Sequence, residues 1–205
     1  MTARDKLLDA AVAIVRTRGL HATTVDDLCA SAGVTKGAFF HHFESKEALA
    51  VAAAGHWGTT TAALFAAAGF HDLPDPAERV FGYLDLRATM VSDDPAEFTC
   101  LAGTMVQEAF ATAPNVRDAC AAAIFDHAAT LEADLAAALN ALAEPPVGVT
   151  ARSLAVHTQT VLQGAFILAK AANDPAILAD SIEHLRRYLR CVLDPRPDQG
   201  ATSDA

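Results

Sequence analysis

Residues 35–42 combine one lysine, two histidines and aromatic rings with small side chains, a set suited to binding rather than to catalysis. If this segment forms a helix that begins after Thr35, then Lys36, Gly37 and Ala38 occupy its first turn. A helix with a narrow N-terminal end fits the major groove of DNA, which is about 12 Å wide. The segment therefore predicts a helix that approaches base edges with its first turn.

Flanking residues extend this candidate surface, because groups on either side of such a helix hold the phosphates. The predicted DNA-contacting residues are Thr23, Thr24, Thr35, Lys36, Gly37, Ala38, Phe40, His41, His42 and Lys46. The alternative is an ordinary helical hairpin with a surface histidine pair. Spacing alone does not separate these two interpretations.

Two short helices joined by a tight turn are expected to position these residues. Thr24 can cap the first helix, with Asp27 in the position of a capping box. Gly33 supplies the left-handed residue that commonly ends a helix. Phe39 and Phe43 are four residues apart, so both can point from the second helix into a core.

Residues 7–49 resemble the DNA-binding domain of the TetR family of transcriptional repressors. The resemblance rests on Ala10-Ala11, Gly19, Thr23-Thr24-Val25, Ala32-Gly33-Val34-Thr35-Lys36-Gly37, Phe39-Phe40-His41-His42-Phe43, Ser45-Lys46-Glu47 and Leu49. It implies a helix-turn-helix domain followed by a domain that binds a small ligand and dimerises through its final helices. One departure is Phe40, where the family usually has a tyrosine whose hydroxyl reaches a phosphate.

Composition predicts an all-α chain. The 205 residues are 52% apolar and rich in alanine, whereas aromatic residues make up 6%. We expect about nine helices, arranged as an N-terminal three-helix helix-turn-helix DNA-binding domain (1–47) and a larger C-terminal helical ligand-binding and dimerisation domain (48–194). A flexible tail (195–205) is expected to follow, because this segment is rich in proline, glycine and aspartate. A long helix over 45–68 would join the two domains and transmit changes between them.

Charge is distributed unevenly along the chain. Residues 1–50 hold six Lys/Arg and six Asp/Glu, so the whole net charge of −10 falls on residues 51–205. We expect the acidic part to face away from DNA and the dependence of binding on salt to be shallow. The four scattered cysteines, and the lack of a signal segment or membrane span, predict a cytoplasmic protein with reduced thiols.

No catalytic or metal-binding pattern is visible. The sequence has no Gly-rich phosphate loop, no His-Glu-x-x-His, no Gly-x-Ser-x-Gly and no pair of histidines four residues apart. We therefore expect no cofactor, no metal and no enzymatic activity. An enzyme that uses the second domain, with Arg87 and the histidines as candidate groups, is the rival hypothesis. A helical binding module without DNA affinity is another, and redox sensing by a cysteine is a variant of the main interpretation.

The second domain mixes aromatic, methionine and glutamine residues, as a cavity for a small molecule does. The predicted lining is Phe65, Tyr83, Met90, Met105, Phe125, Gln159, Gln163 and Phe166. The alternative for each of these residues is a place in an aromatic core. Helices over 149–172 and 175–193 are expected to form a homodimer, the second through a stripe of Leu178, Ile182, Leu185, Leu189 and Val192. The alternative is that both helices close the core of a monomer. Together these patterns predict a repressor that a small-molecule effector releases from a palindromic DNA operator.

Overall fold

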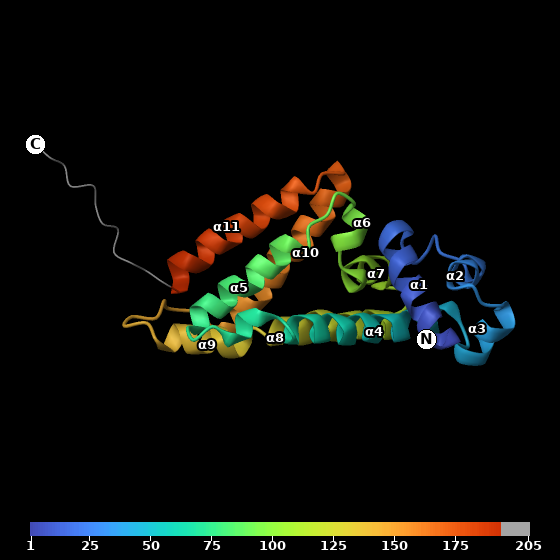
Figure 1. Ribbon diagram of the computed structural model, residues 1–205, viewed down its shortest axis with the longest axis horizontal. Coiled ribbons are helices and arrows are strands. Elements are labelled where there is room, and N and C mark those ends of the chain that lie inside the picture. The colour runs from blue at the N-terminus through green and yellow to red at the C-terminus, as the bar shows by residue number, and fades with distance from the viewer. Residues whose placement is uncertain (194–205) are drawn as a thin grey trace, which may run out of the picture.

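The computed structural model describes residues 1–193, apart from the side chains of residues 95 and 96, and the predicted tail 195–205 lies outside this range. The described chain is helical throughout and elongated, with its N-terminal helices gathered at one end (Figure 1). This end comprises α1 (Ala3–Arg18), α2 (Val25–Ala32) and α3 (Lys36–His42). The long helix α4 (Lys46–Ala66) leads from it into the rest of the molecule.

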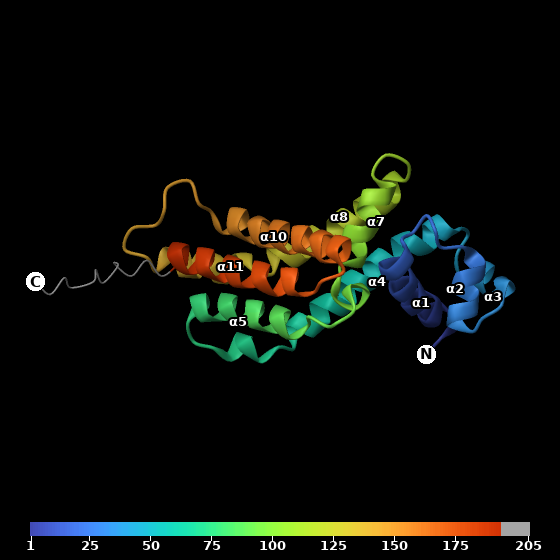
Figure 2. The same ribbon diagram turned by 90° about the horizontal axis from the view of Figure 1, so that it is seen from above.

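In the larger part of the molecule α4 packs against α7 and α8, whereas α5, α9, α10 and α11 pack mainly against one another. Figure 1 shows α8 running along α4. Helices α10 and α11 lie side by side, with α5 next to α11 (Figure 2). After α4 the elements are a 3-10 helix η1 (Gly69–Asp72), α5 (Pro76–Thr89), α6 (Pro95–Phe98), α7 (Leu101–Ala109), α8 (Pro114–Ala129), α9 (Glu132–Asn140), α10 (Ala151–Ala172) and α11 (Ala176–Leu193). The all-α fold is confirmed. Within residues 1–193, no helix combines the length and apolar composition that crossing a membrane requires.

The sequence predicts one helix over about 96–110 and another over about 114–142, but each of these segments forms two helices in the structure. The segment 96–110 forms α6 and α7, because the guanidinium of Arg16 takes the backbone carbonyls of Glu97 and Thr99. The segment 114–142 forms α8 and α9. At that break the hydroxyl of Thr130 donates to the carbonyl of His127 at 2.7 Å, a local bond that competes with the helical pattern.

The hydrophobic core consists of two clusters, and the first one crosses the predicted domain boundary. Leu7, Leu28 and Phe39 of the N-terminal helices are at most 1% exposed, and Met105 and Val116 belong to the same cluster. The N-terminal helices are therefore packed against α7 and the start of α8. The second cluster lies between α5, α9, α10 and α11.

The apolar stripe on α11 faces its own protomer. Leu178, Ile182 and Leu185 are each 2% exposed, and Leu189 is fully buried. All of them belong to the second core cluster, with Val192 packed against it. The expectation that this stripe meets a second copy was wrong, and the alternative, closure of the protomer core, is what the structure shows.

Candidate functional site

The turn between α2 and α3 is fixed by local hydrogen bonds. Thr24 and Asp27 form a reciprocal capping box at the start of α2. Gly33 ends α2 in the left-handed region, with φ 62° and ψ 39°, a conformation that costs glycine little. The hydroxyl of Thr35 then accepts from the backbone N–H of Ala38 at 3.1 Å and so caps α3.

One side of α3 is buried and the other faces solvent at the end of the molecule (Figure 1). Phe39 is fully buried and Phe43 is 5% exposed, so both hold the helix onto the N-terminal core. The outward residues include Phe40, which is 56% exposed. Of the predicted set, Thr24, Thr35, Lys36, Gly37, Phe40, His41 and His42 are exposed and Ala38 is half-buried. Eight of the ten predicted residues are thus at least partly accessible, and all of these lie on α3 or at the start of α2 and α3.

Lys36 forms an ion pair that was not expected. Its ammonium lies 2.7 Å from the carboxylate of Asp26, and both side chains remain more than 60% exposed. The pKa of Lys36 is raised, first by the hydrogen bond to Asp26 and then by the charge of that carboxylate. Sequence reasoning missed Asp26 because the turn, not helical spacing, brings it against α3.

Two predicted DNA contacts need correction. The side chain of Thr23 is fully buried, and its hydroxyl donates to the carbonyl of Gly19 at 2.6 Å. The ammonium of Lys46 donates to the carbonyls of Leu20 and Thr23 at 2.9 and 2.8 Å. Both side chains therefore fasten the loop before α2 rather than extend outward.

The second domain contains a cavity of about 250 Å³ between α4, α5, α8 and α10, which α1 and the α6–α7 junction also reach. Its lining comprises Arg16, Trp57, Thr60, Thr61, Leu64, Arg87, Met90, Glu97, Phe98, Cys100, Ala123, Ile124, His127, Gln159, Gln163 and Phe166. Four predicted residues are among them: Met90, Gln159, Gln163 and Phe166.

The other predicted lining residues lie elsewhere. Phe65 and Tyr83 border a neighbouring cavity of about 230 Å³. Met105 is fully buried in the first core cluster and borders none of the cavities described here, so its assignment was wrong. Phe125 is 56% exposed on the outer side of α8, which also overturns its assignment.

A network of polar groups forms one wall of the 250 Å³ cavity. The hydroxyl of Tyr83 accepts from Arg87 Nε at 3.0 Å and from Gln159 Nε2 at 3.1 Å. His127 Nε2 lies 3.1 Å from the same hydroxyl and 2.7 Å from an Arg87 Nη. Because the arginine can only donate, His127 Nε2 is an acceptor and its ring proton sits on Nδ1.

The imidazole of His127 is neutral at physiological pH. Burial, and to a lesser extent the nearby charge of Arg87, lower its pKa to about 3. Sequence reasoning overlooked Arg16, Trp57 and His127 as lining residues. The available signal was their placement on helices expected to pack together, but the rotation of each helix was unknown.

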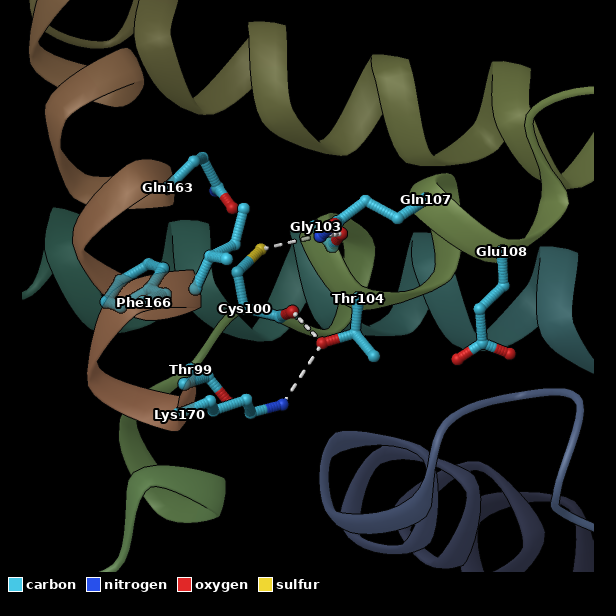
Figure 3. Close-up of a pocket in the computed structure, with 10 residues that line it drawn as sticks. Thr99, Cys100, Gly103, Thr104, Gln107, Glu108, Gln163, Phe166 and Lys170 are labelled. Carbon is cyan, nitrogen blue, oxygen red and sulfur yellow. Dashed lines mark hydrogen bonds between the residues drawn. The ribbon is translucent and has the colours of Figure 1, made fainter. Parts of the chain in front are cut away.

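A smaller cavity of about 240 Å³ lies next to the first and shares Cys100, Gln163 and Phe166 with it. Figure 3 shows its lining, with the carboxylate of Glu108 directed toward the N-terminal helices. That carboxylate accepts from the backbone N–H groups of Leu20 and His21 at 3.1 and 2.6 Å.

On the same side of the molecule, Lys170 donates to the carbonyl of Arg16 at 2.7 Å. The second domain thus holds the C-terminal end of α1 and the loop after it. Among residues 1–193, no group of three or more His, Cys, Asp or Glu side chains is placed to hold a metal ion.

Sequence comparisons match both parts of the chain. The family model described as "Bacterial regulatory proteins, tetR family" matches residues 7–53. A second, "Transcriptional regulator LmrA/YxaF-like, C-terminal domain", matches residues 76–184, which is more than half of the chain. The chain belongs to the TetR family of bacterial regulatory proteins. It is a DNA-binding transcriptional regulator and not an enzyme.

Relatives with curated descriptions match only the N-terminal part. The transcriptional repressor KstR2 of Mycolicibacterium smegmatis is 52% identical over 44 residues, and KstR2 of Rhodococcus jostii is 48% identical over 46 residues. Each match covers 22% of this chain and 22% of the relative. This likeness therefore concerns the DNA-binding region alone.

Solved structures match nearly the whole chain. A TetR-family regulator from Agrobacterium tumefaciens has a TM-score of 0.78 at 19% identity, covering 91% of this chain and 96% of that one. A TetR regulator from Chloroflexus aurantiacus has a TM-score of 0.77 at 25% identity, covering 91% and 93%. The fold is thus shared along its length, although the residues that line the cavity need not be.

Proposed function

We propose that this regulator is a homodimeric repressor, released from a palindromic operator when a small molecule occupies the cavity beside Arg87. The observation that carries the DNA-binding part is the capped, outward-facing helix α3 at one end of the molecule. In the proposal its first turn, with Gly37 and Ala38, approaches base edges in the major groove. Around it, Thr24, Thr35, Lys36, Phe40, His41 and His42 meet the sugar-phosphate backbone.

Two features of the chain support the assignment of DNA binding to its N-terminal part and of ligand binding to the rest. The domains are taken as 1–47 for DNA binding and 48–194 for ligand binding and dimerisation, linked by α4. The net charge of residues 1–50 is zero and that of residues 51–205 is −10, so the N-terminal part is the one that phosphates repel least. Since chromosomal DNA is the target, the protein would act in the cytoplasm.

The proposed dimer forms through α10 and α11, but not through the apolar stripe of α11. Both helices keep large apolar side chains exposed outside the protomer core: Ile167 is 47%, Leu168 58% and Tyr188 42% exposed. A two-fold related copy that packs against α10 and α11 can cover these side chains. The two α3 helices must then lie about 34 Å apart to enter successive major grooves on one face of DNA.

Release follows from the contacts between the cavity and α1. Arg16 belongs to α1, yet its guanidinium lines the cavity, holds the carbonyls of Glu97 and Thr99, and lies 4.9 Å from the ring centroid of Trp57. A small molecule that binds better when this part of the cavity wall is rearranged shifts the dimer toward a second conformation. In that conformation the spacing of the two α3 helices no longer matches successive major grooves. A coupling free energy of about 1–3 kcal/mol suffices for measurable release.

Fluorescence anisotropy with DNA fragments from around the gene tests the proposal. Lys36→Ala should weaken binding to all sequences, because it removes a phosphate contact. Substitutions of Ala38 should change the order of preference among operator variants. Arg117→Ala, an exposed arginine of the second domain, is the matched control and should leave both unchanged. If wild type and variants give equally flat titrations, the chain is a binding module without DNA affinity and the proposal fails.

A further inference from the structure

Two arginines on α5 have opposite surroundings. Arg79 donates to the carboxylate of Asp134 at 2.7 Å, and both side chains are about one-fifth exposed. Arg87, two turns later and also partly buried, has no carboxylate oxygen within 4.0 Å among residues 1–193. Charges removed from water usually have a partner of opposite sign. Arg87 therefore lacks the carboxylate partner that Arg79 has.

The neighbours of Arg87 are neutral. Its Nε and one Nη bond to Tyr83 and His127, whereas its Nη1 has no hydrogen-bond partner among the described residues. The guanidinium also lies over the ring of Phe65, 4.5 Å from the centroid. The network thus fixes the position of the cation, leaves both N–H donors of Nη1 unused and supplies no negative charge.

The rest of the cavity wall is mostly apolar, and its charges sum to a positive value. Arg16 and Arg87 contribute two positive charges and Glu97 contributes one negative charge. Glu97 acts electrostatically on Arg16, whose own Nε and Nη2 donors bond to backbone carbonyls. The cavity is therefore positive although residues 51–205, which supply all of its lining except Arg16, have a net charge of −10.

We propose that the molecule bound here is an amphipathic organic acid, whose carboxylate pairs with Arg87. Its apolar body lies against Trp57, Phe98 and Phe166 and fits the volume of about 250 Å³. A carboxylate that accepts from Nη1 uses these free donors and neutralises the charge of the guanidinium. This inference rests on the proposed effector cavity and adds the chemical class of the effector.

Trp57 gives a direct measurement, because it is the one tryptophan of the sequence and it lines the cavity. Its fluorescence is recorded at pH 7.5 while the DNA-free protein is titrated with 4-phenylbutyrate, octanoate and the corresponding amides. We expect saturable binding of the acids, at least about 10-fold tighter than that of the amides, because a charge-assisted hydrogen bond is lost in the amide. Equal affinities for acid and amide, or no saturable binding of either acid, would overturn the inference.

Variants assign the effect to Arg87. Arg87→Met should weaken binding of the acids by roughly 10- to 100-fold and leave the amides unchanged, whereas Arg87→Lys should restore part of the difference. Arg117→Met, at an exposed arginine paired with its neighbour Asp118, is the control. Circular dichroism melting checks that each variant is folded. If Arg87→Met does not fold, the Arg87→Lys variant and the comparison of acids with amides on the wild type still test whether Arg87 pairs with the carboxylate.

Acid binding that is unaffected by either substitution would also overturn the inference. Because no DNA is present, these measurements are independent of the operator titrations. A protein that binds the acids through Arg87 but no DNA would refute the proposed function and leave this inference intact. A protein that binds DNA but shows no preference for acids would refute this inference and leave the proposed function intact.

Discussion

The two ends of this protein use positive charge in different ways. On α3, Lys36 pairs with Asp26 in water, and more than 60% of each side chain is exposed. In the second domain, Arg87 is partly buried and held by the neutral groups of Tyr83 and His127. The first arrangement is a solvated ion pair and the second a fixed cation without a counter-charge.

This difference suits the two tasks proposed above, DNA binding by α3 and effector binding in the cavity. An exposed ion pair is weak and screened, so Lys36 can exchange its carboxylate for a phosphate at small cost. A buried network is costly to disturb, so Arg87 keeps its position whether or not the cavity is occupied. The DNA-binding surface therefore depends on exchangeable contacts, and the cavity on a rigid one.

The largest effect is expected from Tyr83→Phe. It removes the hydroxyl that accepts from Arg87 and Gln159, and so leaves two donors unsatisfied in a buried site. The free energy of unfolding should fall by about 3 kcal/mol, measured by urea denaturation. The other tyrosine, Tyr188, is 42% exposed, and Tyr188→Phe should change stability by less than about 0.5 kcal/mol. Equal effects of the two substitutions would mean that the network is not rigid.

Acid should weaken the same network. The pKa of His127 is about 3 in the folded protein, below its ordinary value of 6.5, so only the unfolded state takes up this proton between those values. The free energy of unfolding that depends on the neutral imidazole is fully present above pH 6.5. It is lost as pH falls toward 3, with a slope of about 1.4 kcal/mol per pH unit. Between pH 7.5 and 5.0, wild type should lose about 2 kcal/mol more stability than His127→Gln. Parallel losses would show that His127 is not held neutral.

The contrast between the α3 surface and the cavity also explains which features could be predicted from the sequence. Helix caps, the turn and the exposed side of α3 depend on residues close together in the chain, so Thr24, Gly33 and Thr35 were placed correctly. Even there, the contact of Lys36 with Asp26 depends on how the turn orients two helices, and it was missed.

The cavity depends on how helices far apart in sequence are rotated against each other. The apolar periodicity of α8 does not show that Phe125 faces solvent and His127 faces the cavity. Similarly, the stripe on α11 is equally compatible with a partner and with the protomer core until α5 and α10 are in place. Local patterns thus specified the elements, whereas the site in the second domain required the packing.

A smaller effect is expected where the two regions meet. Glu108→Gln removes the negative charge that accepts from the backbone N–H groups of Leu20 and His21. The exchange of these two amide hydrogens should become about 10-fold faster, because a charge-assisted hydrogen bond becomes a neutral one. Amide exchange followed by NMR measures this, and the amides of Phe39 and Phe43 serve as internal controls. Unchanged protection would mean that this contact does not hold the loop.

The smallest effect, on Asp26, tests the idea that the ion pair of α3 is exchangeable. Asp26→Asn removes the carboxylate that competes with phosphate for Lys36, and it also removes a negative charge next to the DNA. Operator affinity should therefore rise by about 2- to 10-fold, with no measurable change in thermal stability. Asp118→Asn is the control, because Asp118 is also exposed and paired with an arginine, but in the second domain. Should Asp26→Asn instead weaken operator binding, the pair would be holding Lys36 in its DNA-binding position, and the contrast between an exchangeable and a fixed cation would no longer hold.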